Sequence, residues 1–167
     1  MNRHFNEKVN IVPAVMPVNL ATGANTGDWV CMKYYGRCAI VFIAGVGAAS
    51  QDPTITVLQA TTITGTSSKA LNFTRIDTKQ GSALTAVGQF TTVTQAAANT
   101  YTSDTSGETQ KVWVIDIKAE DLDIDNGFDC VSVTMADVGT ASQVGTLLFM
   151  MHEPREATAP LPSAIIN

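Results

Sequence analysis

Residues 110–118, QKVWVIDIK, decide the fold class of this chain. Apolar side chains occupy every second position, so that Trp113, Ile115 and Ile117 share one face of an extended segment. A period of two is the period of a β-strand that buries one face. The stretch therefore predicts a strand packed on a hydrophobic core.

Further strand-like segments lie on both sides of this one. The stretch 37–44, RCAIVFIA, is apolar at odd and even positions alike, which predicts a strand covered on both faces. Residues 119–122 are expected to form one helical turn, and 95–107 an exposed loop. The other predicted strands are 28–33, 53–60, 69–77, 90–94, 130–136 and 143–151. This pattern predicts an all-β single domain, a β-sandwich or jelly roll.

The two ends of the chain carry prolines and are expected to be extended. Pro13 and Pro17 interrupt an apolar segment at 9–20, and proline is confined to the edges of sheets because it lacks a donor. We therefore expect an N-terminal arm at 1–20, a sandwich domain at 21–152 and a C-terminal tail at 153–167. Docking of both ends on their own domain is the alternative to docking on a neighbour. The candidate partner-binding residues are Val12, Val15, Met16, Leu161, Ile165 and Ile166.

The composition narrows the classes of partner. The 167 residues carry a net charge of −5, and the basic residues are scattered, which argues against binding to nucleic acid. No segment approaches the roughly 18 apolar residues of a membrane span, and residues 1–10 lack the apolar stretch of a signal peptide. Three cysteines without CxxC spacing predict buried thiols rather than disulfides or a zinc site. Assembly in a reducing host cytoplasm is expected.

The sequence offers few residues for catalysis. His4 and His152 are the two histidines, and neither lies in a pattern that predicts a triad with a nucleophile and an acid. No G-x-S-x-G motif is present, and the glycines near residue 45 match no phosphate-binding loop. We expect a protein that is not an enzyme and that needs no cofactor.

One acidic cluster resembles the start of a calcium loop. Asp121, Asp123 and Asp125 alternate as calcium ligands do. The glycine then falls one place late, at Gly127, and Ser132 occupies the position of the closing glutamate. The three aspartates are therefore weak metal candidates, and an acidic surface edge with no metal is the favoured interpretation.

Four segments, which together span most of the chain, resemble a known family. They are MNRHFNEKVNIVPAVMPV (1–18), KALNFTRIDTKQG (69–81), DLDIDNGFDCVSV (121–133) and EPREATAPLPSAI (153–165). In these segments the chain resembles head decoration, or cement, proteins of tailed bacteriophages. The resemblance implies a β-rich homotrimer that binds the major capsid protein on the outside of the capsid and stabilises the shell. Localisation on the virion surface follows from the same resemblance.

Two other functions are left open by the sequence. A head–tail connector or tail-tube subunit is a second structural role. A glycan- or receptor-binding virion module is the third, because Trp29, Tyr34, Tyr35 and Tyr101 could supply an aromatic stacking surface. Aromatic residues fill cores and interfaces more often than they form such surfaces.

Overall fold

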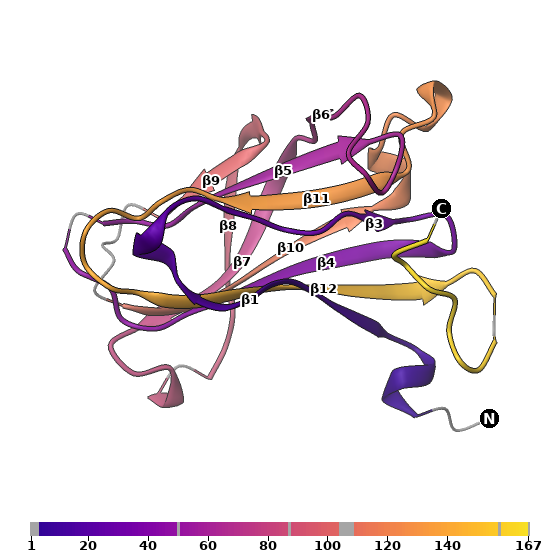
Figure 1. Cartoon of the computed structure of the whole chain (residues 1–167). Coiled ribbons are helices and arrows are strands. Elements are labelled where there is room, and N and C mark those ends of the chain that lie inside the picture. The colour runs from indigo at the N-terminus through magenta and orange to yellow at the C-terminus, as the bar shows by residue number, and fades with distance from the viewer. Residues whose placement is uncertain (1–3, 50, 87, 104–108, 157, 167) are drawn as a thin grey trace.

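The computed structural model describes residues 4–49, 51–86, 88–103, 109–156 and 158–166, which form two β-sheets packed face to face (Figure 1). All described strand pairs are antiparallel. Sheet A consists, in spatial order, of β1 (Asn10–Asn19), β12 (Val144–Pro154), β4 (Tyr35–Ala44), β10 (Gln110–Lys118), β7 (Phe73–Gly81) and β8 (Thr91–Ala98). Sheet B consists of β2 (Asn25–Thr26), β11 (Cys130–Met135), β5 (Thr54–Ala60) and β6 (Lys69–Ala70), with β3 (Val30–Cys31) on β11 and β9 (Thr100–Thr102) on β5. The short 3-10 helices are η1 (Phe5–Glu7), η2 (Leu20–Thr22), η3 (Leu84–Ala86), η4 (Ala119–Asp121) and η5 (Ile124–Asn126).

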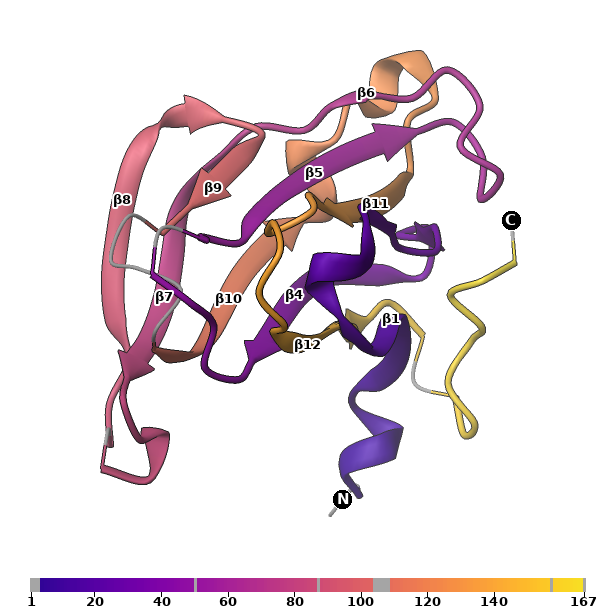
Figure 2. The ribbon, with the colours of Figure 1, turned by 60° about the vertical axis from the view of Figure 1, so that its left-hand side comes forward.

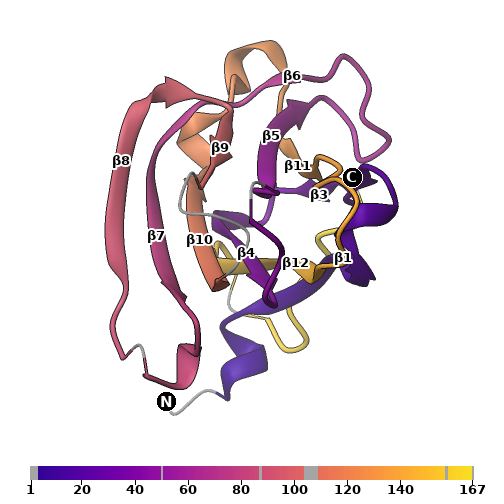
Figure 3. The same cartoon turned by 90° about the vertical axis from the view of Figure 1, so that its left-hand side faces the viewer.

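The strand order is that of a jelly roll. Along the chain, β1 lies in sheet A, β2 and β3 in B, β4 in A, β5 and β6 in B, β7 and β8 in A, β9 in B, β10 in A, β11 in B and β12 in A. The first strand consequently lies beside the last, and β2 lies beside β11, as in two nested Greek keys. The β7–β8 hairpin extends sheet A at one edge (Figure 3). The predicted all-β, jelly-roll-like single domain is confirmed.

The hydrophobic core lies between the two sheets. Trp113, Ile115 and Ile117 of β10 face inward and are almost completely buried, as the alternation in 110–118 predicts. The Trp113 ring lies 4.9 Å from Phe42 of β4 and, edge-on, 4.9 Å from Tyr101 of β9. Burial of each large apolar side chain contributes about 1.5–3 kcal/mol, so these rings fasten the two sheets to each other.

The N-terminal segment is the edge strand of sheet A. β1 pairs with β12, and its register shifts between Pro13 and Val15 and again between Val15 and Val18. Proline and irregular pairing at an edge protect it against adding another strand. The segment predicted as an arm therefore lies along the edge of its own domain.

Three strand predictions differ from the structure. The strand expected at 28–33 is shorter, because only β3 pairs there. The segment 69–77 divides into β6 in sheet B and β7 in sheet A, and the chain changes sheets at residues 71–72. The loop expected at 95–107 is mostly strand where the structure describes it, since β8 continues through a run of alanines and β9 follows. Residues 104–107 lie outside the described part. Pairing with β7 and β5 outweighs the weak strand propensity of alanine.

Candidate interaction surface

The outward side of sheet A is apolar across its central strands. β12, β4 and β10 direct alternate side chains into the core and the others away from it. One outward row consists of Leu148, Val41 and Val114, which lie opposite one another on these strands. The outer side of an antiparallel sandwich sheet usually carries polar residues, because it faces water. We call this surface the open face; its apolar members are Ile11, Pro13, Ala39, Val41, Ile43, Val112, Val114, Leu148 and Met150.

No other layer of the described chain lies over the open face. In Figure 2, sheet B lies on one side of sheet A, and the described segments add no third layer on the other side. Ile43 is 40% exposed and Ile11 is 47% exposed, while Val41 and Val114 are half-buried beside their neighbours. Within the described part of the chain, residues 37–44 are covered on the core side alone, so the prediction that they are covered on both faces is wrong there.

One end of the open face is charged. Arg37 of β4 contacts Asp116 Oδ2 of β10 through Nε at 2.9 Å and through Nη2 at 2.8 Å. Asp116 Oδ1 lies 3.3 Å from Nε2 of His152 on β12, and Arg37 Nε lies 4.0 Å from Glu153. The register brings these groups together, since Arg37 pairs with both His152 and Lys118. Three strands thus contribute to one network of charges.

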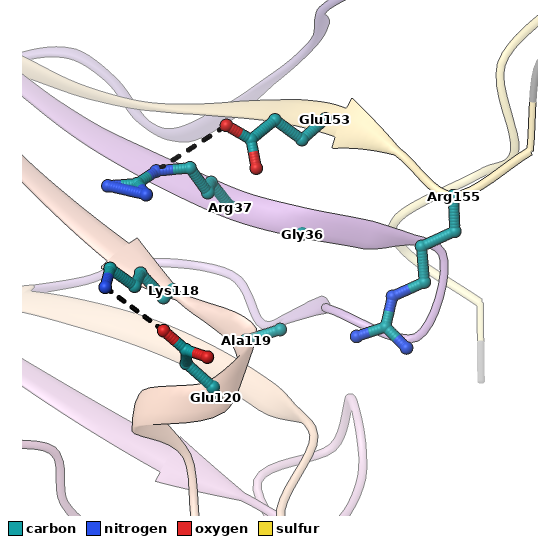
Figure 4. Close-up of a pocket in the computed structure, with 7 residues that line it drawn as sticks. All are labelled: Gly36, Arg37, Lys118, Ala119, Glu120, Glu153 and Arg155. Carbon is teal, nitrogen blue, oxygen red and sulfur yellow. Dashed lines mark hydrogen bonds and ion pairs between the residues drawn. The ribbon is translucent and has the colours of Figure 1, made fainter.

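Two hollows adjoin this network. The first, of about 290 Å³, is lined by both signs of charge, and Figure 4 shows Arg37, Glu153, Lys118 and Glu120 around it, with Arg155 at one end. Lys118 Nζ lies 3.1 Å from Glu120 Oε1. The second hollow, of about 380 Å³, is lined by Arg37, Arg75, Asp77, Val114, Asp116 and Lys118. Arg37 and Lys118 line both hollows, which therefore adjoin each other at the charged end of the open face.

Asp77 holds a fixed negative charge beside the second hollow. The Thr92 hydroxyl donates to Asp77 Oδ1 at 2.6 Å, and Arg75 Nη2 lies 3.0 Å from the same oxygen. These contacts, led by the Thr92 hydroxyl, hold the pKa of Asp77 below the ordinary value of 3.8. The carboxylate stays ionised at neutral pH and suits recognition of a charged partner.

The arrangement around His152 differs from that of a nucleophilic active site. A triad needs an imidazole placed between an orienting acid and a nucleophile. Asp116 is in place, but within the described part of the chain no serine, threonine or cysteine hydrogen bonds with His152. The arrangement can therefore bind and orient charged groups.

The predicted calcium candidates do not converge on one point. Asp121 accepts a hydrogen bond from the backbone of Lys118, and Asp123 binds Lys69 and accepts from Asn126. Asp125 is exposed. Asp121 and Asp123 thus have different partners in the structure.

The predicted anchor residues of the two ends fall into two groups. Val12, Val15 and Leu161 are half-buried and pack against the core of their own domain. The tail is further held by Ala164, whose carbonyl accepts from the Cys31 N–H at 2.7 Å. The second group of anchor residues is exposed to solvent: Met16 is 66% exposed, Ile165 54% and Ile166 62%.

The aromatic residues do not form a stacking surface. Tyr35 is fully buried, and Tyr101 packs edge-on against Trp113 inside the sandwich. Trp29 is half-buried against a small apolar cluster, and Tyr34 is packed against the main core. A platform built from the four predicted residues is therefore absent among the described side chains.

Comparisons with other proteins add nothing to this description. No family model, no curated protein and no solved structure matches the chain. Within the described residues, no helix has the length and apolar character that crossing a membrane requires.

Proposed function

We propose that this chain is a structural virion protein that docks on the shell of a bacteriophage head and stabilises it. The observation that carries the proposal is the open face. The four segments that resemble decoration proteins supply the class of partner, the major capsid protein. The open face supplies the surface through which such a partner is bound.

The first support for this assignment is strand β4, which carries apolar side chains on both of its faces. Its inward residues are buried in the core, whereas Val41 and Ile43 face outward with no cover from the described chain. An apolar sheet face on a single chain is typical of an interface with another protein. A partner would provide the second cover that the sequence pattern predicts.

The charged end of the open face is the second support. Protein interfaces combine an apolar centre with a polar rim that fixes orientation and excludes wrong partners. Here the apolar rows adjoin Arg37, Asp116 and His152 on the same sheet. Both signs of charge occur at this rim, which favours a protein partner with matching charges over a uniformly charged polymer such as nucleic acid.

The exposed residues of the two ends provide further contact points. Met16 on the edge strand and Ile165 and Ile166 in the tail remain exposed. We propose that they contact neighbouring subunits on the shell, including other copies of this chain in the trimer that the resemblance implies. Such contacts would bind several subunits together, as a protein that stabilises a shell must do.

Reconstitution on empty heads tests the proposal. Purified chain is added to expanded, undecorated heads of the phage that encodes it, bound protein is measured by co-sedimentation, and head stability by heating. We expect saturable binding and a higher temperature of head disruption. Ile43→Glu places a charge among the apolar residues of the open face, beside Val112, so it should weaken binding at least tenfold while the isolated domain stays folded.

A matched variant separates this effect from a general loss of solubility or folding. Ile124 of η5 is 53% exposed and lies outside the open face, so Ile124→Glu should bind as the wild type does. Equal binding by the wild type and Ile43→Glu would refute the role of the open face. No binding by any form would refute capsid docking, and rings or tubes in negative stain would indicate a connector or tail-tube subunit instead.

A further inference from the structure

Two cysteines that are far apart in the sequence lie opposite each other on sheet B. Cys31 of β3 pairs with Cys130 of β11. The hydrogen bond beside them runs from the Met32 N–H to the Asp129 carbonyl at 2.7 Å, while the Cys31 N–H donates elsewhere, to Ala164. The two cysteines therefore form a non-hydrogen-bonded pair, the kind in which opposite side chains are closest.

The carboxylate of Asp129 completes a cluster with the two thiols. The Cys31 thiol donates to Asp129 Oδ2 at 3.7 Å, and the Cys130 thiol donates to Oδ1 at 3.2 Å. The two sulfurs and the carboxylate oxygen all lie within 4.8 Å of one another. Trp29 and Ile63 cover the cysteines, which are at most 1% exposed. Three potential ligand atoms thus converge in a sheltered position.

We propose that Cys31, Cys130 and Asp129 form a binding site for a thiophilic divalent cation, with Zn²⁺ as the expected ion. Zinc takes cysteine sulfur and carboxylate oxygen as ligands in tetrahedral geometry. The cluster supplies three of the four ligands. Calcium and magnesium are excluded because they require a shell of oxygen atoms.

Asp129 connects the cluster to the surface of the protein. Asp129 is only half-buried and lines a surface hollow of about 200 Å³. Met32, Lys33 and Arg155 line the same hollow. Water from the hollow can take the fourth position, and two cationic side chains lie near the carboxylate. They would offset the single negative charge that two thiolates, one carboxylate and Zn²⁺ leave.

Metal binding would change the protonation of both cysteines. Zinc would replace both protons: two S–H bonds break, the protons pass to the buffer, and two S–Zn bonds form. No oxidation or reduction takes place.

The carboxylate distinguishes a metal site from a disulfide. A Cys31–Cys130 disulfide would use only the two sulfurs and would remove both thiol donors from Asp129. A metal uses all three groups that the structure brings together. Bound zinc would fasten the two-residue strand β3 to β11, and this role is independent of docking on a capsid.

Metal binding to the whole purified chain tests the proposal. Under reducing conditions we expect one equivalent of Zn²⁺ by elemental analysis and a zinc-dependent rise in the melting temperature. Co²⁺ alone should produce thiolate-to-cobalt charge-transfer absorption, which Zn²⁺ removes and millimolar Ca²⁺ does not. Asp129→Asn keeps both thiols and should weaken Zn²⁺ binding by at least about tenfold, since even outer partners of metal ligands contribute that much.

Cysteine variants and a control complete the experiment. Cys31→Ser and Cys130→Ser should lose the cobalt absorption, while Cys38→Ala, which alters a cysteine buried between the two sheets, should retain it. Absence of stoichiometric Zn²⁺ binding by the folded wild type would overturn the proposal. Equal affinity in Asp129→Asn would overturn the assignment of the carboxylate. A Cys31–Cys130 disulfide in protein isolated from a reducing cytoplasm would replace the metal site with a redox pair.

Discussion

Replacing Gly65 with alanine tests how the loop at 61–68 packs over the outer side of sheet B. Gly65 has a φ of +78°, and a Cβ atom there would lie 2.7 Å from Nε1 and 2.9 Å from Cε2 of Trp29. Trp29 covers the cluster of Cys31, Ala60 and Cys130. Gly127 provides a matched control, because its φ is +80° and nothing lies within 4 Å of a Cβ added there.

The two substitutions share a backbone cost and differ in a steric one. A non-glycine residue in the left-handed region costs about 1–2 kcal/mol. Gly127→Ala should lose only this amount. Gly65→Ala should lose a further 1–3 kcal/mol or so, because the Trp29 ring must move out of its position. The total expected for Gly65→Ala is therefore about 2–5 kcal/mol.

Urea denaturation measures both free energies of unfolding, and the melting temperature gives a second readout. A loss of 1 kcal/mol lowers the melting temperature of a chain of this size by about 2–4 °C. We also expect Cys31 and Cys130 to react faster with a thiol reagent in Gly65→Ala than in Gly127→Ala. If the two variants lose the same free energy, Trp29 does not pack against this loop and the reasoning is refuted.

Three further predictions concern the tail, the charged hollow and the core. Tyr35→Phe removes the hydroxyl that donates to the Pro162 carbonyl, so it should cost about 1–2 kcal/mol in urea denaturation and speed proteolysis of the tail. Asp77→Asn should flatten the fall in the free energy of unfolding at acid pH. In the wild type the pKa of Asp77 is lowered, first by the Thr92 hydroxyl, so the ionised carboxylate stabilises the fold above pH 3.8. This contribution is lost as the pH falls through the pKa of the folded state. An acid titration of unfolding that is equally steep in both proteins would contradict that role. Phe149→Ala leaves a cavity between the sheets and should cost about 3–5 kcal/mol by calorimetry, whereas a loss below 1 kcal/mol would mean that the core is not closed there.

The fold could be predicted from the sequence wherever a strand has one buried face. The alternation around Trp113 gives the strand, its inward side and the sandwich class, because a period of two has a single structural meaning. The prolines at 13 and 17 place β1 at an edge for an equally local reason. The loop prediction was wrong at the alanine run 96–98, since the strand there forms through pairing with β7 rather than through the propensity of alanine.

The candidate sites were harder to predict because they depend on contacts between distant segments. The open face left a signal in 37–44, whose two apolar faces indicate a second cover, but only the structure shows that the described part of the chain does not provide that cover. The pairing of Cys31 with Cys130 left no signal: the two residues lie 99 positions apart in the sequence, and only the register of β3 on β11 brings them together. Spacing within the sequence detects metal ligands when they share a loop, and it cannot detect a pair formed across strands.

A reconstruction of decorated heads by electron cryomicroscopy would show whether the open face contacts the capsid shell. We expect density for the jelly roll on the outside of the expanded shell, with the outward side of sheet A against the capsid protein and Ile43 buried in the contact. Density for this domain with the open face directed to solvent, or its absence from the shell, would refute docking through the open face.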